Sequence, residues 1–158
     1  MKRVVAAVAS VILMAVMTGA TAAPGATTGP VPEDPTDSVR ASEYWLDQYG
    51  VREAWKTTRG AGQKIAIIDT GIGRGPAEFT GAVAGGTDVS GVGASDGRTP
   101  VGAVDANHGS WVASLAAARG TGNGRGMIGV APEAELLSIS VASAPPARSP
   151  SPSRSPRR

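Results

Sequence analysis

The sequence predicts an α/β fold built on a doubly wound, mostly parallel sheet. Residues 62–69 and 135–141 are apolar runs of strand length, as expected of strands that are buried on both faces. Residues 107–120 lie between them and carry apolar side chains at helical spacing. The order strand, helix, strand is that of a right-handed parallel βαβ unit.

The first 22 residues have the pattern of a secretory signal peptide. Lys2 and Arg3 precede an apolar run over residues 4–17, and the small residues 20–22 form a cleavage site. An apolar run of about 14 residues is too short to cross the roughly 30 Å hydrocarbon core of a membrane. We therefore expect a protein that is secreted, extracellular or associated with the cell envelope, with no transmembrane segment beyond the signal peptide.

The elements before the first strand follow from composition and from local signals. Residues 23–41 are rich in Pro and Gly and predict a linker. Ser42 is expected to cap a helix, and a second helical turn is expected over residues 52–57. The apolar face of these helices is expected to contain Trp45, Leu46, Tyr49 and Val51.

After the first long strand, residues 82–89 predict one further short strand, and residues 42–141 together form the expected folded domain. Residues 142–158 lose all periodicity and are rich in Ser, Pro and Arg, which predicts a disordered tail. A basic tail could bind RNA or an anionic surface. An aberrant C-terminus is the interpretation we favour, because the change comes directly after a strand.

The predicted sheet is smaller than a complete doubly wound fold. A body of about 100 residues supplies roughly three strands and two helices, too few to cover both faces of the sheet. We therefore expect a truncated sheet with exposed apolar faces and marginal stability, in a protein that is monomeric or prone to aggregation.

Composition excludes several classes of function. The chain has no cysteine and a single histidine, so thiol chemistry is excluded and no metal- or cofactor-binding set is predicted. Its net charge is +2, but the two ends contain six of the fifteen basic residues and no acidic residue. Residues 23–141 contain nine basic and thirteen acidic residues. This acidic body argues against a nucleic-acid partner.

Two glycine motifs stand in the wrong context. Residues 124–129 fit G-x-G-x-x-G, but a predicted helix precedes this loop and a strand follows it, the reverse of a dinucleotide site. Residues 93–97 fit the G-x-S-x-G turn of α/β-hydrolases, with Ser95, Asp105 and His108 in the matching order. No helix follows Ser95, and the interval to His108 is too short to hold both partners. We reject both motifs.

Asp69 and His108 are the candidate catalytic residues. Asp69 ends a buried strand, where α/β folds place groups that handle ligands, although an aspartate here can also serve only to start a turn. His108 begins a predicted helix, whose dipole favours the neutral imidazole that a general base requires. The two residues together favour a functional role.

Three segments resemble the subtilisin-like serine proteases. They are "IAIIDTGIG", "HGSWVASLAAARG" and "GMIGVAPEAELLSISV", which are similar to the Asp block, the His block and the following strand of that family. Residues 42–141 resemble most the mycosin-like proteases linked to type VII secretion. The resemblance implies a polypeptide substrate and a triad in which Asp69 orients His108, the general base. It also allows for calcium, although no specific residues of this chain indicate a calcium site.

The resemblance is incomplete, because no G-T-S-M-A block with the family's nucleophile occurs in the sequence. Ser138, Ser140 and Ser143 lie in or after a predicted strand and lack the helix start that supports such a serine. We therefore expect a subtilisin-like endopeptidase fragment that is inactive alone. Two alternatives stay open: a non-catalytic binding protein or pseudoprotease, and an aspartic protease that uses Asp69-Thr70-Gly71.

Overall fold

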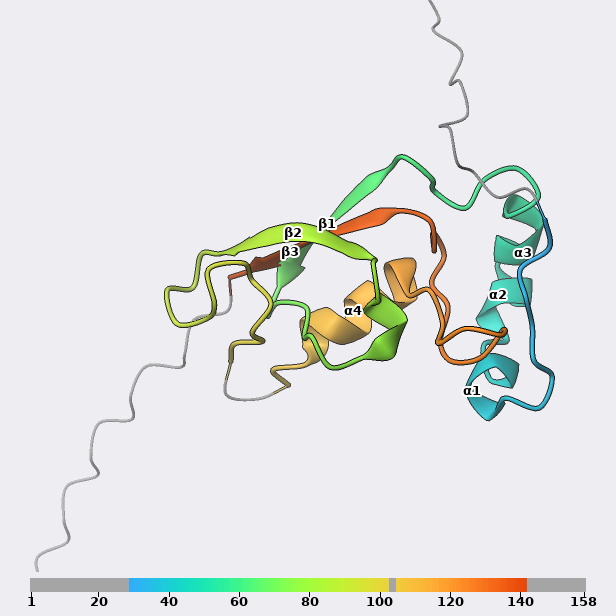
Figure 1. The fold of residues 1–158 in the computed structure, drawn as a ribbon, viewed down its shortest axis with the longest axis horizontal. Helices are drawn as coiled ribbons and strands as arrows, with labels where there is room; N and C mark the ends of the chain where they lie inside the picture. Colours follow the sequence, from blue (N-terminus) through green and yellow to red (C-terminus); the bar gives the residue numbers. More distant parts are fainter. Residues whose placement is uncertain (1–28, 103–104, 142–158) are drawn as a thin grey trace, which may run out of the picture.

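The computed structural model describes residues 29–102 and 105–141. At their centre is a sheet of three parallel strands with β3 in the middle (Figure 1). The strands are β1 (Lys64–Asp69), β2 (Val83–Asp88) and β3 (Glu135–Ser140). The predicted α/β class and parallel sheet are confirmed.

The helix α4 (His108–Ala117) connects β2 to β3 and covers one face of the sheet (Figure 1). β1 and β3 run in register, from Lys64 opposite Glu135 to Asp69 opposite Ser140. A short 3₁₀ helix, η1 (Ala77–Phe79), lies between β1 and β2. The buried core under α4 consists of Ile67, Ile72, Phe79, Ala82, Ala113, Ala117 and Leu136.

The N-terminal helices are shorter and more numerous than predicted. They are α1 (Ser38–Ala41), α2 (Trp45–Gln48) and α3 (Val51–Ala54), which stack beside one end of the sheet (Figure 1). The first of them falls in the segment that composition assigns to a linker. A second buried cluster consists of Leu46, Val51 and Trp55 from this region and Ile128 from the loop before β3.

Two local predictions about these helices are wrong. Ser42 does not begin a helix: it follows α1, and its hydroxyl donates to the carbonyl of Ser38. A serine hydroxyl can bond to a backbone carbonyl four residues earlier, and here that bond replaces the expected cap. Tyr49 does not join the apolar face, because it follows the end of α2 and is 74% exposed.

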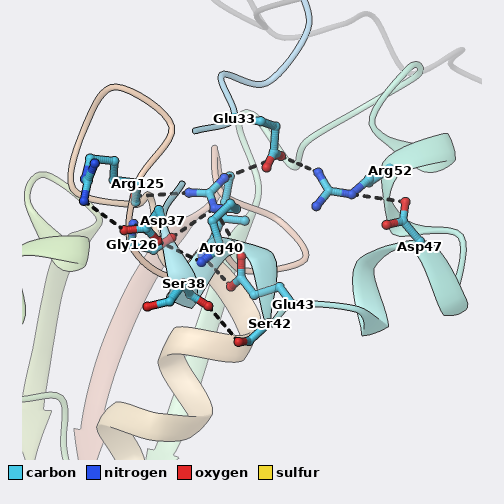
Figure 2. A network of polar contacts seen from close by, with 11 residues as sticks. Glu33, Asp37, Ser38, Arg40, Ser42, Glu43, Asp47, Arg52, Arg125 and Gly126 are labelled. Carbon is cyan, nitrogen blue, oxygen red and sulfur yellow. Dashed lines mark hydrogen bonds and ion pairs between the residues drawn. The ribbon is translucent and has the colours of Figure 1, made fainter. Parts of the chain in front are cut away.

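A buried arginine joins this N-terminal segment to the glycine-rich loop before β3 (Figure 2). The guanidinium of Arg40 donates to the carbonyls of Arg125 and Gly126 and forms ion pairs with Glu33 and Glu43 (Figure 2). Burial raises the pKa of Glu43, against the opposing effect of its hydrogen bond from a backbone N–H in the loop. The loop is therefore held by side chains far away in the sequence.

Part of the apolar surface stays uncovered, as the small size of the sheet predicts. Ile68 on β1 is 64% exposed, and Trp111 and Leu115 on α4 are also exposed. None of the helices within the described ranges has the length and hydropathy of a membrane span. The expected signal peptide, the Ser/Pro/Arg-rich tail and Ser143 lie outside the described residues.

Candidate active site

The structure brings Asp69 and His108 together at one edge of the sheet. Asp69 is the last residue of β1, and His108 is the first residue of α4. The Asp69 Oδ2 atom lies 2.8 Å from His108 Nδ1. The Asp69 side chain is largely buried, whereas that of His108 is 55% exposed. The pair therefore joins a shielded carboxylate to an imidazole that solvent or a ligand can reach.

The protonation of Asp69 decides what the pair can do. Burial acts to raise the pKa of Asp69, but hydrogen bonds from the Thr70 backbone N–H and from His108 outweigh it, and the pKa lies below its ordinary value. Asp69 is thus an anion at neutral pH and accepts a hydrogen bond from His108 Nδ1–H. This contact selects one tautomer of the neutral ring and leaves Nε2 free to accept a proton.

The turn after Asp69 packs too closely against two neighbouring segments for any side chain at Gly71 or Gly109. A Cβ atom on Gly109 would lie 2.6 Å from the carbonyl oxygen of Gly71. One on Gly71, whose φ is +101°, would lie 2.6 Å from the carbonyl oxygen of Gly97. The start of α4 and the segment 97–99 therefore both pack directly against the backbone of this turn.

His108 is further restrained by its own helix. The ring of Trp111 packs edge-on against the imidazole, with 6.5 Å between the ring centroids. The backbone N–H of His108 donates to the carbonyl of Asp105, which has a positive φ of 54°. The Asn107 side chain does not cap the helix, and the backbone N–H of Gly109 in its first turn instead donates to Thr70 Oγ1.

Three serines that the sequence offers as possible nucleophiles lie in β3 or in an irregular loop. Ser138 and Ser140 are completely buried in β3, and their hydroxyls donate to Gly97 and Asp88. Ser95 lies in an irregular loop, and its carbonyl accepts from the backbone of Asp88.

Sequence reasoning missed the role of two hydroxyls. Ser138 accepts from the N–H of Ile72, and Ser110 accepts from the N–H of Gly73. Both serines support the loop that follows Asp69. A polar residue at a position that faces the core is the only signal of this role in the sequence.

The described residues offer no donor set for a metal ion. Within residues 29–102 and 105–141, no three His, Cys, Asp or Glu side chains group closely enough to hold one.

Comparison with known proteins shows the family of this chain. A family model described as the subtilase family matches residues 60–152. The chain belongs to the subtilase family. It is 36% identical to Thermitase of Thermoactinomyces vulgaris over 110 residues. This alignment covers 70% of the chain and 36% of Thermitase. It is 41% identical to Mycosin-4 of Mycobacterium tuberculosis over 88 residues. This alignment covers 55% of the chain and 17% of Mycosin-4.

Solved structures support the same fold. MycP1 from Mycobacterium smegmatis matches 72% of this subtilase chain with 27% identity and a TM-score of 0.51, over 27% of its own length. MycP1 from the ESX-1 type VII secretion system matches 71% with 26% identity and a TM-score of 0.52, also over 27% of its own length. The chain thus spans about a third or less of the relatives that it matches.

The family and the fold overturn one alternative. An aspartic protease built around Asp69-Thr70-Gly71 would be an all-β protein. In this subtilase the same three residues connect a parallel strand to a loop beneath α4, and the carboxylate faces an imidazole rather than a second carboxylate.

Proposed function

We propose that this subtilase chain supplies the Asp and His members of an Asp-His-Ser triad for peptide-bond hydrolysis. The 2.8 Å contact between Asp69 Oδ2 and His108 Nδ1 carries the proposal. It supports the assignment of Asp69 as the orienting carboxylate and His108 as the general base. Residues 42–141 then correspond to the first part of a peptidase domain.

The mechanism follows from the two ring nitrogens of His108. Nε2 takes the proton of a serine hydroxyl while the serine oxygen attacks the peptide carbonyl, and later returns this proton to the leaving amine. During these steps the ring becomes a cation. Asp69 stabilises that cation through Nδ1–H and stays ionised, in keeping with its lowered pKa.

We further propose that the 158-residue chain has no protease activity alone, because its sequence contains no serine block of the family type. In subtilisin, removal of the catalytic serine alone lowers kcat by about 2 × 10⁶. Asp69 and His108 therefore need a serine from another segment of polypeptide. The purified chain should neither cleave a peptide substrate nor react with a fluorophosphonate probe.

A chimera tests the proposed function directly. Residues 42–141 replace the corresponding segment of Thermitase, which then contributes its own serine. We expect the chimera to cleave a chromogenic peptide, and the same chimera with Asp69→Asn or His108→Gln to lose at least about 10⁴ in kcat. A folded chimera that is inactive, or whose activity survives both substitutions, would show that these residues do not form a triad. Unaltered Thermitase is the control.

We also propose that the protein acts outside the cytosol, at the cell envelope or beyond it. The signal-peptide pattern of residues 1–22 supports this, as does the likeness to mycosins and to a chain of a periplasmic assembly from the ESX-5 inner membrane complex. In a bacterial secretion host the exported chain should begin at Ala23. An uncleaved chain confined to the cytosol would contradict the proposal.

A non-catalytic binding role stays the alternative. It gains support if the chimera is folded but inactive, while the unaltered chain binds a polypeptide in a complex that salt weakens.

A further inference from the structure

The loop after the Asp69 turn has an unusual set of partners. Each of the four backbone polar groups of Ile72 and Gly73 is bound by a side chain. Their N–H groups donate to Ser138 Oγ at 2.8 Å and Ser110 Oγ at 2.9 Å. Their carbonyls accept from one guanidinium, that of Arg98, at 2.8 Å from Nε and 3.0 Å from Nη2.

Asp96 connects the loop that contains Arg98 to the loop that Arg98 captures. Its backbone N–H donates to Asp96 Oδ1 at 3.0 Å, and the Asp96 carboxylate also pairs with Arg74, which directly follows the captured loop. The two loops therefore hold each other through reciprocal arginines. Gly97, which lies between Asp96 and Arg98 in the sequence, adopts a φ of +67°, and its carbonyl accepts a hydrogen bond from the buried Ser138 hydroxyl.

The loop that contains Arg98 also bonds to the turn that follows Asp69. The N–H of Val101 donates to the carbonyl of Thr70 at 2.8 Å, and only two residues separate Asp69 from Ile72. Residues 97–101 therefore contact this turn directly. Partial burial and the nearby charge of Arg74 lower the pKa of Arg98, but an arginine keeps its charge throughout the ordinary pH range.

We propose that Arg98 is a positioning residue, which holds the Asp69 carboxylate in place against His108 by capturing the carbonyls of Ile72 and Gly73. The planar guanidinium offers two donors in a fixed arrangement, whereas a lysine ammonium is a single point charge on a flexible stem. Without Arg98 the two carbonyls lose their partners and the loop shifts, and Asp69 shifts with it. The catalytic value of this placement rests on the proposed function, but the placement itself does not.

The test observes the Asp69–His108 contact in the full chain without any need for activity. His108 is the only histidine, so its imidazole nitrogens give one set of ¹⁵N resonances, which report whether Nδ1 or Nε2 carries the proton. In the unaltered protein at neutral pH we expect the proton on Nδ1. Asp69→Asn should shift the tautomer ratio toward Nε2–H by at least about tenfold, the scale of one lost charge-assisted hydrogen bond.

Arg98→Ala should shift the same ratio by roughly threefold to tenfold, and Arg98→Lys by a smaller factor in the same direction, because the charge alone cannot capture both carbonyls. Arg125→Ala is the matched control: it removes a partly exposed arginine that binds the N-terminal segment instead of the Asp69 loop. It should lower the melting temperature without a change in tautomer.

Three results would overturn the proposal. The first is an unchanged tautomer ratio in Arg98→Ala while Asp69→Asn changes it. The second is an equal shift in Arg125→Ala, which would indicate general loosening. The third applies if circular dichroism shows that Arg98→Ala does not fold. In that case an unchanged tautomer ratio in Arg98→Lys would overturn the proposal. Because no catalysis is measured, an inactive Thermitase chimera would sink the proposed function and leave this result standing.

Discussion

Thr70 Oγ1 accepts a hydrogen bond of 2.9 Å from the backbone N–H of Gly109. Thr70 directly follows Asp69, and Gly109 directly follows His108, so this bond joins the two segments that carry the candidate catalytic residues. The contact between carboxylate and imidazole is therefore supported by a second bond only one residue away on each side. Such supporting contacts keep a catalytic geometry from loosening.

The Thr70 hydroxyl should be required for this junction. Thr70→Val keeps the shape of the side chain but removes the acceptor, so we expect a loss of about 1–2 kcal/mol in the free energy of unfolding. Thr70→Ser should retain most of the stability. Chemical denaturation measures both, and amide exchange at Gly109 should become faster only in the valine variant. Equal exchange in the two variants would argue against the bond.

Gly109 should tolerate no side chain. In Gly109→Ala the new Cβ would meet the backbone of Gly71 rather than a movable side chain, so the turn or the helix start must shift, at a cost of about 1–3 kcal/mol. Gly75→Ala is the control, because a Cβ at Gly75 has no atom within 4 Å and the residue has no positive φ. Thermal melts should therefore separate the two alanine variants; similar melting temperatures would contradict the close approach.

Ser138→Ala should be costly although it removes one oxygen atom. The hydroxyl bridges the N–H of Ile72 and the carbonyl of Gly97, and its loss leaves two buried groups without this partner. Each such group costs about 1–3 kcal/mol. Ser114→Ala is the comparison, since the Ser114 hydroxyl only donates to a carbonyl of its own helix. Denaturant titration should show the larger loss for Ser138, and the reverse order would refute the bridging role.

Stability should fall in acid as Asp88 takes up a proton. Hydrogen bonds from the hydroxyls of Ser140 and Ser90 lower the pKa of Asp88 from 3.8 to about 2. Because the folded pKa is the lower one, the stabilisation is complete above about pH 4 and is lost as the pH falls toward 2. The lowered pKa of Asp69 adds a contribution of the same sign.

Asp88→Asn measures the share of Asp88 in this effect. Unfolding midpoints between about pH 5 and pH 2 should depend less on pH in the variant than in the unaltered chain. Parallel curves would mean that other carboxylates cause the loss. Asp47→Asn, which changes an exposed carboxylate in the N-terminal segment, is the control.

The central βαβ arrangement could be predicted from the sequence because the patterns that indicate it are strong and local. The strand predicted over 62–69 and the helix predicted over 107–120 enclose the observed β1 and α4, since long apolar runs and helical periodicity leave few alternatives. The N-terminal helices were harder. Ser42 can either cap a following helix or close a preceding one, and the tertiary position of α1 decides between these options.

Local sequence patterns were enough to predict the family, the parallel sheet and the two candidate residues, because each depends on a few neighbouring positions. The folded structure was needed to show that Asp69 lies 2.8 Å from His108, and that Arg98, Ser110 and Ser138 bond to the loop beside them. Those contacts join residues far apart in the chain, and their geometry depends on how α4 and β3 pack around the turn. Hydrogen bonds of this kind leave no periodic trace in sequence, since one serine or arginine looks like any other until the fold gives it a partner.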